Sequence, residues 1–170
     1  MACILWMPAP PLQLKMPVSS KVIITDTSCF SVLRKLDALE LLHQLFSVVV
    51  TTPEVAREFR FPLPEWVTVL EVSNKTLQQE YLKFIDAGEA SAIALAAEIP
   101  YDFLILDDNE ARRFAEQLGL SVKGTIGVLV IARDQGLIPA LRPYFERIQQ
   151  QTNFHISAAL LERILRDAGE

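Results

Sequence analysis

Acidic side chains stand in this sequence where strands are expected to end and helices to begin. Asp26 follows the apolar run 22–25, and the pair Asp107 and Asp108 follows a second apolar run at 103–106. Each run is typical of a buried parallel strand, because aliphatic residues fill it without alternation. The carboxyl ends of parallel strands line one edge of an open α/β sheet, so these carboxylates can converge there. Converging carboxylates repel one another, and a divalent cation is the usual remedy.

Taken singly, these aspartates also have ordinary structural explanations. Asp26 can be a helix N-cap, and Asp107 can cap a turn while Asp108 stays exposed. Two adjacent carboxylates after an apolar run cannot both be buried in the ionised form without a cation or hydrogen-bond donors. The pair at 107 and 108 is therefore the strongest local signal in the chain.

Two further acids belong to one helix. Glu58 and Glu54 are spaced i, i+4 and share one face of the helix expected after the run 47–51. That face can be a solvated surface, but side chains lean toward the start of a helix, so Glu58 can reach back toward the edge of the sheet. Glu54 is the alternative nearer to the helix start.

Glu89 follows Gly88 in the first turn of an alanine-rich helix that runs to residue 97. The helix dipole favours a carboxylate there by about 0.3–1 kcal/mol without any catalytic role. The rest of this helix is almost wholly apolar, which favours burial. Glu89 is then expected to point toward the same edge as the aspartates at the strand ends.

The elements that must position these acids alternate along the chain as β-α-α-β-α-β-α-α-β-α-β-α-α-α. This order predicts an α/β fold of three layers, α/β/α, with a mainly parallel sheet. Thr27 or Ser28 is expected to cap the first helix, and Asn109 the helix after the acidic pair. Gly88 is expected to break the chain before the alanine-rich helix, and a later helix is expected to run from Pro139 to residue 151.

Length and composition indicate one domain. With 170 residues and 51% hydrophobic content, residues 21–170 can form one core, whereas the proline-rich residues 1–20 are expected to be a flexible tail without a membrane span or signal peptide. A net charge of -5 argues against non-specific adhesion to nucleic acid but not against a nucleic-acid substrate at a metal centre. The cysteines form no CxxC pair, which favours a reducing cytoplasm.

Competing motifs are weak. His43 and His155 lie far apart, so packed histidines are favoured over zinc ligands. The segment Gly124-Thr125-Ile126-Gly127 lacks both the Rossmann and the P-loop pattern, which leaves a helix start at which Thr125 could orient water or phosphate. A phosphatase of the D-x-D type would need an aspartate where Ser28 stands.

The chain resembles PIN-domain nucleases over residues 21–169 and is similar to the VapC toxins of prokaryotic toxin–antitoxin systems. The matching stretches, specific in this order and spacing, are VIITDTS, VVTTPEVAREF, GEASAIALA, FLILDDNEARR and VKGTIGVL. The likeness is greatest to a PIN subgroup of bacterial and archaeal proteins that carry the doubled aspartate.

The resemblance implies an RNase H-like sheet whose acidic centre binds Mg²⁺ or Mn²⁺ and hydrolyses RNA phosphodiesters. It matches Asp26, Glu58, Glu89 and Asp108 to a catalytic acidic quartet, with Asp107 as a replacement for Asp108 or a fifth metal ligand. Hard cations such as Mg²⁺ prefer these oxygen ligands to histidine or cysteine.

Ser28 matches a small polar position that supports the metal site in this family. Arg112 could contact RNA or pair on a surface helix with Glu110 or Glu116. The implied partners are RNA, a small antitoxin protein and a second copy of the chain, without a membrane. The alternative function is a PIN-like interaction module with weak or no catalysis.

Overall fold

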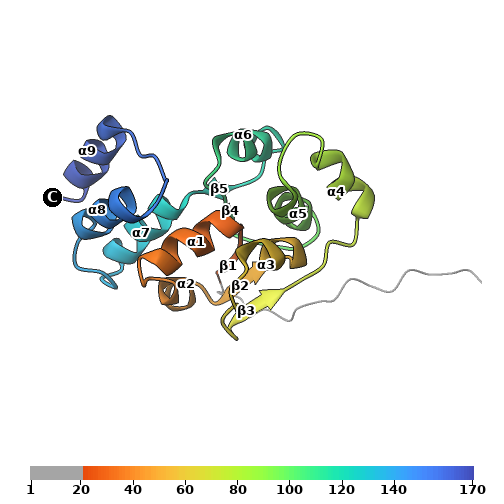
Figure 1. Ribbon diagram of the computed structural model, residues 1–170, viewed down its shortest axis with the longest axis horizontal. Coiled ribbons are helices and arrows are strands. Elements are labelled where there is room, and N and C mark those ends of the chain that lie inside the picture. Colours follow the sequence, from red (N-terminus) through yellow and green to blue (C-terminus); the bar gives the residue numbers. More distant parts are fainter. Residues whose placement is uncertain (1–20) are drawn as a thin grey trace, which may run out of the picture.

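The structure is a computed structural model and describes residues 21–170, so the tail expected at residues 1–20 lies outside the described residues. Within the described part of the chain, five strands and nine helices follow one another in the expected order (Figure 1). The strands are β1 (Val22–Thr25), β2 (Val48–Thr51), β3 (Val67–Val69), β4 (Phe103–Ile105) and β5 (Val122–Lys123). The helices are α1 (Thr27–Lys35), α2 (Glu40–Leu45), α3 (Pro53–Phe59), α4 (Lys75–Tyr81), α5 (Ala87–Ala96), α6 (Asn109–Gln117), α7 (Thr125–Asp134), α8 (Arg142–Gln151) and α9 (Ala158–Asp167).

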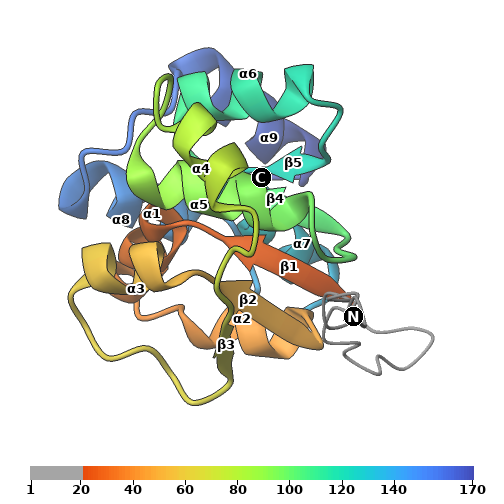
Figure 2. The same ribbon diagram turned by 90° about the vertical axis from the view of Figure 1, so that its right-hand side faces the viewer.

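The described strands form one parallel sheet in the order β3-β2-β1-β4-β5, and Figure 2 shows β3, β2 and β1 side by side. Ile23 in the central strand β1 pairs with Val49 of β2 and with Phe103 of β4. Parallel strands require crossover connections, which the intervening helices supply. This arrangement covers both faces of the central strands and explains their unbroken aliphatic runs.

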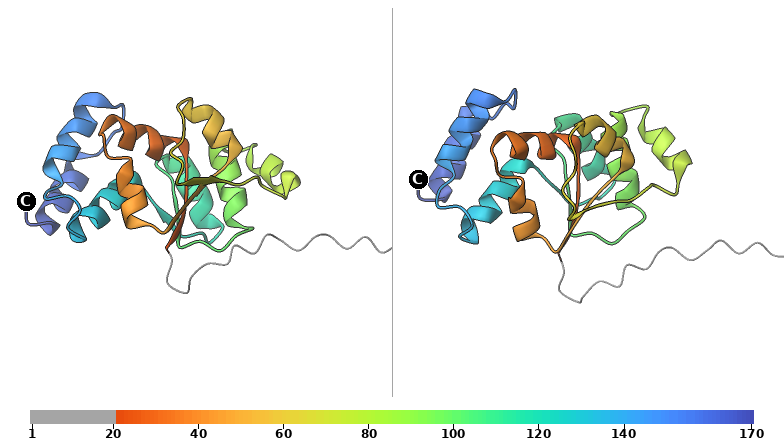
Figure 3. Two further views of the ribbon diagram at one scale, coloured as in Figure 1. Left: turned by 90° about the horizontal axis from the view of Figure 1, so that it is seen from below. Right: turned by 60° about the horizontal axis from the view of Figure 1, so that its bottom comes forward.

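Helices cover both faces of the sheet. Successive strand residues point to opposite faces, so Ile23 and Ile105 join one core with α1, α2 and α7, while Ile24 and Leu104 join a second core with α5 and α6. Figure 3 shows these helix layers on either side of the sheet. The expected three-layer α/β/α fold is therefore confirmed.

Helix α3 contacts both α1 and α5, and its Glu58 carboxylate lies against Gly88 in the first turn of α5. Ser91 of α5 forms a hydrogen bond of 2.6 Å with Thr52, the N-cap of α3, and both side chains are fully buried. A buried polar pair of this kind must stay satisfied, so it holds the start of α3 against the middle of α5. Among residues 21–170, no helix has the length and hydrophobicity that crossing a membrane requires.

The starts of α5 and α8 differ from the sequence prediction. Helix α5 begins at Ala87, because a capping box between Asp86 and Glu89 starts the helix before Gly88 instead of after it. Helix α8 begins at Arg142 rather than at Pro139. The Glu170 carboxylate accepts hydrogen bonds from the Leu141 and Arg142 amides at 2.7 and 2.9 Å. This long-range cap has no local sequence signal.

Candidate functional site

Asp26 lies at the end of β1 and is only 2% exposed. Its Oδ1 accepts a hydrogen bond of 3.0 Å from the Cys29 amide, so Asp26 caps α1 and the expected caps Thr27 and Ser28 do not. An N-cap contributes about 1 kcal/mol, whereas burying an ionised carboxylate costs several kcal/mol. Capping alone therefore does not explain why an acid is buried here.

Asp107 and Asp108 have different partners. Asp107 is half-buried and accepts hydrogen bonds from the Thr125 amide at 2.7 Å and from the Thr125 hydroxyl at 2.5 Å. Asp108 is exposed and caps α6 through Oδ1, which accepts from the Glu110 and Ala111 amides. Asn109, the expected cap, is instead the first residue of α6. Thr125 thus fixes the position of the Asp107 carboxylate through both its amide and its hydroxyl.

The carboxylates at this edge of the sheet affect one another. Burial raises the pKa of Asp26 well above its usual value, and the charges of Asp107 and Glu89 raise it further. Burial also raises the pKa of Asp107, against the opposing bonds from Thr125 and the charge of Arg112. Burial followed by the charge of Asp108 raises the pKa of Glu89 to about 7. The structure therefore brings Asp26, Glu89, Asp107 and Asp108 into one electrostatic cluster.

Glu58 joins this cluster through α5. A Cβ atom added to Gly88 would lie 2.5 Å from Glu58 Oε2, so the Glu58 carboxylate rests against the first turn of α5. The Glu58 charge is one of those that raise the pKa of Glu89. On the same face of α3, Glu54 Oε1 lies 3.5 Å from Arg57, while Glu54 Oε2 is buried without a hydrogen-bond partner among the described residues.

Gly88 is a sensitive test of this packing. Gly88→Ala is expected to keep α5 helical, since alanine favours a helix, but to displace the Glu58 carboxylate from the cluster. If Glu58 is a metal ligand, the variant should lose affinity for Mn²⁺ at nearly unchanged helix content. Circular dichroism and a metal titration measure the two quantities separately; metal affinity equal to wild type would contradict this placement of Glu58.

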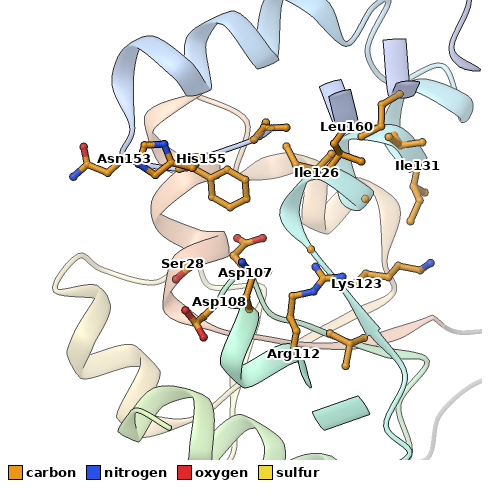
Figure 4. A pocket seen from close by; sticks show the side chains of 18 residues that line it. Ser28, Asp107, Asp108, Arg112, Lys123, Ile126, Ile131, Asn153, His155 and Leu160 are labelled. Carbon is orange, nitrogen blue, oxygen red and sulfur yellow. The ribbon is translucent and has the colours of Figure 1, made fainter. Parts of the chain in front are cut away.

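Two hollows meet at Asp108, which lines both. The larger has a volume of about 830 Å³ and extends from Ser28, Asp107 and Arg112 toward α7 and the C-terminal segment (Figure 4). The smaller has a volume of about 310 Å³ and includes Glu89 and Phe84. Asp107, Asp108 and Glu89 therefore line these hollows, whereas Asp26 and Glu58 line neither.

Ser28 and Arg112 line the larger hollow. Arg112 donates to the Leu106 carbonyl at 3.3 Å, and no ion pair joins it to Glu110 or Glu116 within the described chain. Its guanidinium opposes the rise in the pKa of Asp107. The charge of Arg112 thus acts on Asp107 rather than pairing with Glu110 or Glu116.

The sequence prediction missed the residues that complete the hollows. His155 was expected to be packed, but it is exposed and lines the larger hollow with Asn153 (Figure 4). Phe84 lines the smaller one. No motif marks these positions, because the fold alone brings the segment after α8 and the segment after α4 beside the acids.

The donor set suits a hard divalent cation. Every acid in the cluster offers only carboxylate oxygens, and a cation would relieve both the burial of Asp26 and the repulsion that Asp107 and Glu89 exert on it. Within residues 21–170, no three acidic, histidine or cysteine side chains are already close enough to hold a metal ion. The exposed Glu58 and Asp108 can adopt other rotamers, and the cap of α6 uses only Oδ1 of Asp108.

The raised pKa values predict how stability depends on pH. Without metal, the folded protein holds protons that the unfolded chain has released, so the free energy of unfolding should fall as pH rises from about 5.5 to about 8. Glu89, with a pKa of about 7 instead of 4.5, should account for part of this fall. Urea unfolding across this range measures the slope, and Glu89→Gln should reduce it. A stability that rises over the same range would contradict the acidic cluster.

The sequence matches a known protein family. The family model for the PIN domain matches residues 22–170, which is most of the chain. No curated protein matches the chain.

Proposed function

Because the chain belongs to the PIN domain family, whose members are generally metal-dependent nucleases, we propose that it is an endoribonuclease that uses Mg²⁺ or Mn²⁺. One observation carries the proposal: carboxylates from separate elements gather at one edge of the sheet, where Asp26 is buried and the charges of Asp107 and Glu89 add to the effect of burial on its pKa. A protein that only served as a scaffold would have no physical reason to gather uncompensated acids there.

Asp26, Glu58, Glu89 and Asp108 would hold the cation, with Asp107 beside them. When bound, it would lower the pKa of a water molecule that attacks the phosphodiester and would offset the charge on the leaving oxygen. Hydrogen bonds within the protein orient two of the acids before the cation binds. The Cys29 amide orients Asp26, and Thr125 orients Asp107. Arg112, which lines the larger hollow, would contact a substrate phosphate.

RNA incubated with the purified protein tests the proposal. Cleavage should require Mn²⁺ or Mg²⁺ and stop when a chelator removes the ion. Internal cuts in a circular RNA would establish endonuclease activity, because a circle has no ends. Absence of cleavage with either ion on varied RNAs would count against the proposed function.

The two glutamates of α3 should differ in importance. Glu58→Gln is expected to reduce the cleavage rate far more than Glu54→Gln, because Glu58 lies against the start of α5 and acts on Glu89, whereas Glu54 pairs with Arg57. Single-turnover rates at saturating Mn²⁺ compare the two matched variants. A larger loss of cleavage rate in Glu54→Gln would show that Glu54, nearer to the start of α3, is the metal ligand instead of Glu58.

We further propose that the chain is the toxin of a toxin–antitoxin pair, restrained by a small antitoxin and active as a homodimer. The support is the resemblance of its motifs to the VapC toxins. Growth arrest on expression, absent in the Asp26→Asn variant, would support the toxin role. Unimpaired growth together with metal-dependent cleavage in vitro would leave the nuclease without the toxin role.

A further inference from the structure

Phe84 is unusually exposed for a large aromatic side chain. It lies between α4 and α5 and is 65% exposed, the largest exposed fraction among the big hydrophobic residues of the described chain. Its ring stacks on Phe114 of α6, with centroids 5.6 Å apart and planes inclined by 25°. Phe114 in turn meets Tyr81 of α4 edge to face at 5.1 Å. The Phe84 ring thus stacks against α6 while much of its surface faces solvent.

The exposed ring belongs to the same hollow as two of the acids. Phe84 lines the smaller hollow together with Glu89 and Asp108, and Asp86 and Glu110 complete its polar lining. The volume of about 310 Å³ is at the lower end of the range for small-molecule sites. A hollow of this size suits a single flat ring better than a segment of another protein. An occupant of this hollow would lie directly beside the acidic cluster.

We propose that Phe84 is a stacking platform for the nucleobase next to the phosphodiester that is cut. The proposal rests on the proposed nuclease function and adds a binding residue to it. Base–aromatic stacking contributes about 1–3 kcal/mol per base, which is enough to position a strand. A ring already held by Phe114 loses little side-chain entropy when the base binds.

The lining of the hollow also predicts which bases it prefers. Ionised carboxylates only accept hydrogen bonds, and Asp86 and Glu110 offer them at the rim. Cytosine carries an amino group that donates to carboxylates, whereas uracil presents a carbonyl oxygen at the corresponding position. We therefore expect cytosine to be favoured over uracil on Phe84.

Fluorescence tests the subsite without cleavage. Phe84→Trp in the Asp26→Asn background, in Mg²⁺, should show saturable quenching by a short cytidine oligonucleotide and weaker quenching by the uridine oligonucleotide. The Asp26→Asn protein without the new tryptophan is the control for Trp6 and Trp66. Quenching equal to that control would overturn the proposal.

Cleavage kinetics provide the second test. Phe84→Leu should lower kcat/KM by about tenfold or more, mainly by raising KM, and Phe84→Tyr should restore it. Phe61→Leu is the matched control, because Phe61 is also exposed but lines neither hollow. Equal cleavage by Phe84→Leu and Phe61→Leu would overturn the subsite and leave the nuclease function intact. If the wild type cuts no RNA, the proposed function fails and the fluorescence titration decides the subsite alone.

Discussion

Asp26→Asn is expected to abolish metal-dependent RNA cleavage while the protein stays folded. Asparagine caps a helix as well as aspartate, so the bond from the Cys29 amide to residue 26 can persist. The variant loses the charge that the cation needs. We expect the rate to fall about a thousandfold or more, since one lost charge-stabilising group costs about a hundred- to a thousandfold.

The same variant should be more stable than the wild type when metal is absent. Asp26 is buried, and neighbouring acids raise its pKa further, so removing its charge relieves repulsion. Each kcal/mol relieved should raise Tm by about 2–4 °C in a protein of this size. Cleavage assays and thermal melting in a chelator measure the two effects. Undiminished cleavage by a verified variant would remove Asp26 from the catalytic group.

Millimolar Mn²⁺ or Mg²⁺ is expected to raise the Tm of the wild-type protein. An ion that binds only the folded state stabilises it by about 2.7 kcal/mol at a hundredfold excess over Kd, equivalent to about 5–10 °C here. This test needs no substrate, so it examines the metal site independently of RNA.

The rise in Tm should shrink in Asp26→Asn and in Asp108→Asn. It should persist in Glu162→Gln, because Glu162 is an exposed acid on α9 and lines neither hollow. The control separates specific binding from the general effect of ions on an acidic protein. A Tm that ignores both ions at high concentration would favour the interaction module without catalysis.

The fold could be predicted from the sequence because its signals are local. The apolar runs 22–25 and 103–106 identify central parallel strands, and Gly119 and Gly136, which follow α6 and α7, have the positive φ angles typical of glycines that end helices. The helix start at Arg142 was missed: Pro143 in the first turn is a local signal for it, but the carboxylate that caps the first amides belongs to the distant Glu170. A cap from a distant part of the chain cannot be recognised in the residues next to the helix boundary.

The candidate site was predictable only in part, for the same reason. Strand ends locate Asp26 and Asp107, and helix starts locate Glu89. The different partners of Asp107 and Asp108 depend on Thr125, which the sheet brings beside them. Phe84 and His155 carry no motif, so only the packing of their segments places them beside the acids.

The double use of Asp26 and Asp108, as helix caps and as acids of the cluster, has a consequence for evolution. A lineage that no longer needs catalysis can lose either charge, but it still needs a capping side chain. Asparagine, serine and threonine meet that need, whereas alanine costs about 1 kcal/mol. Natural variants at these two positions should therefore drift toward neutral caps. Such a pattern would distinguish a pseudoenzyme that has kept its fold from a decaying gene.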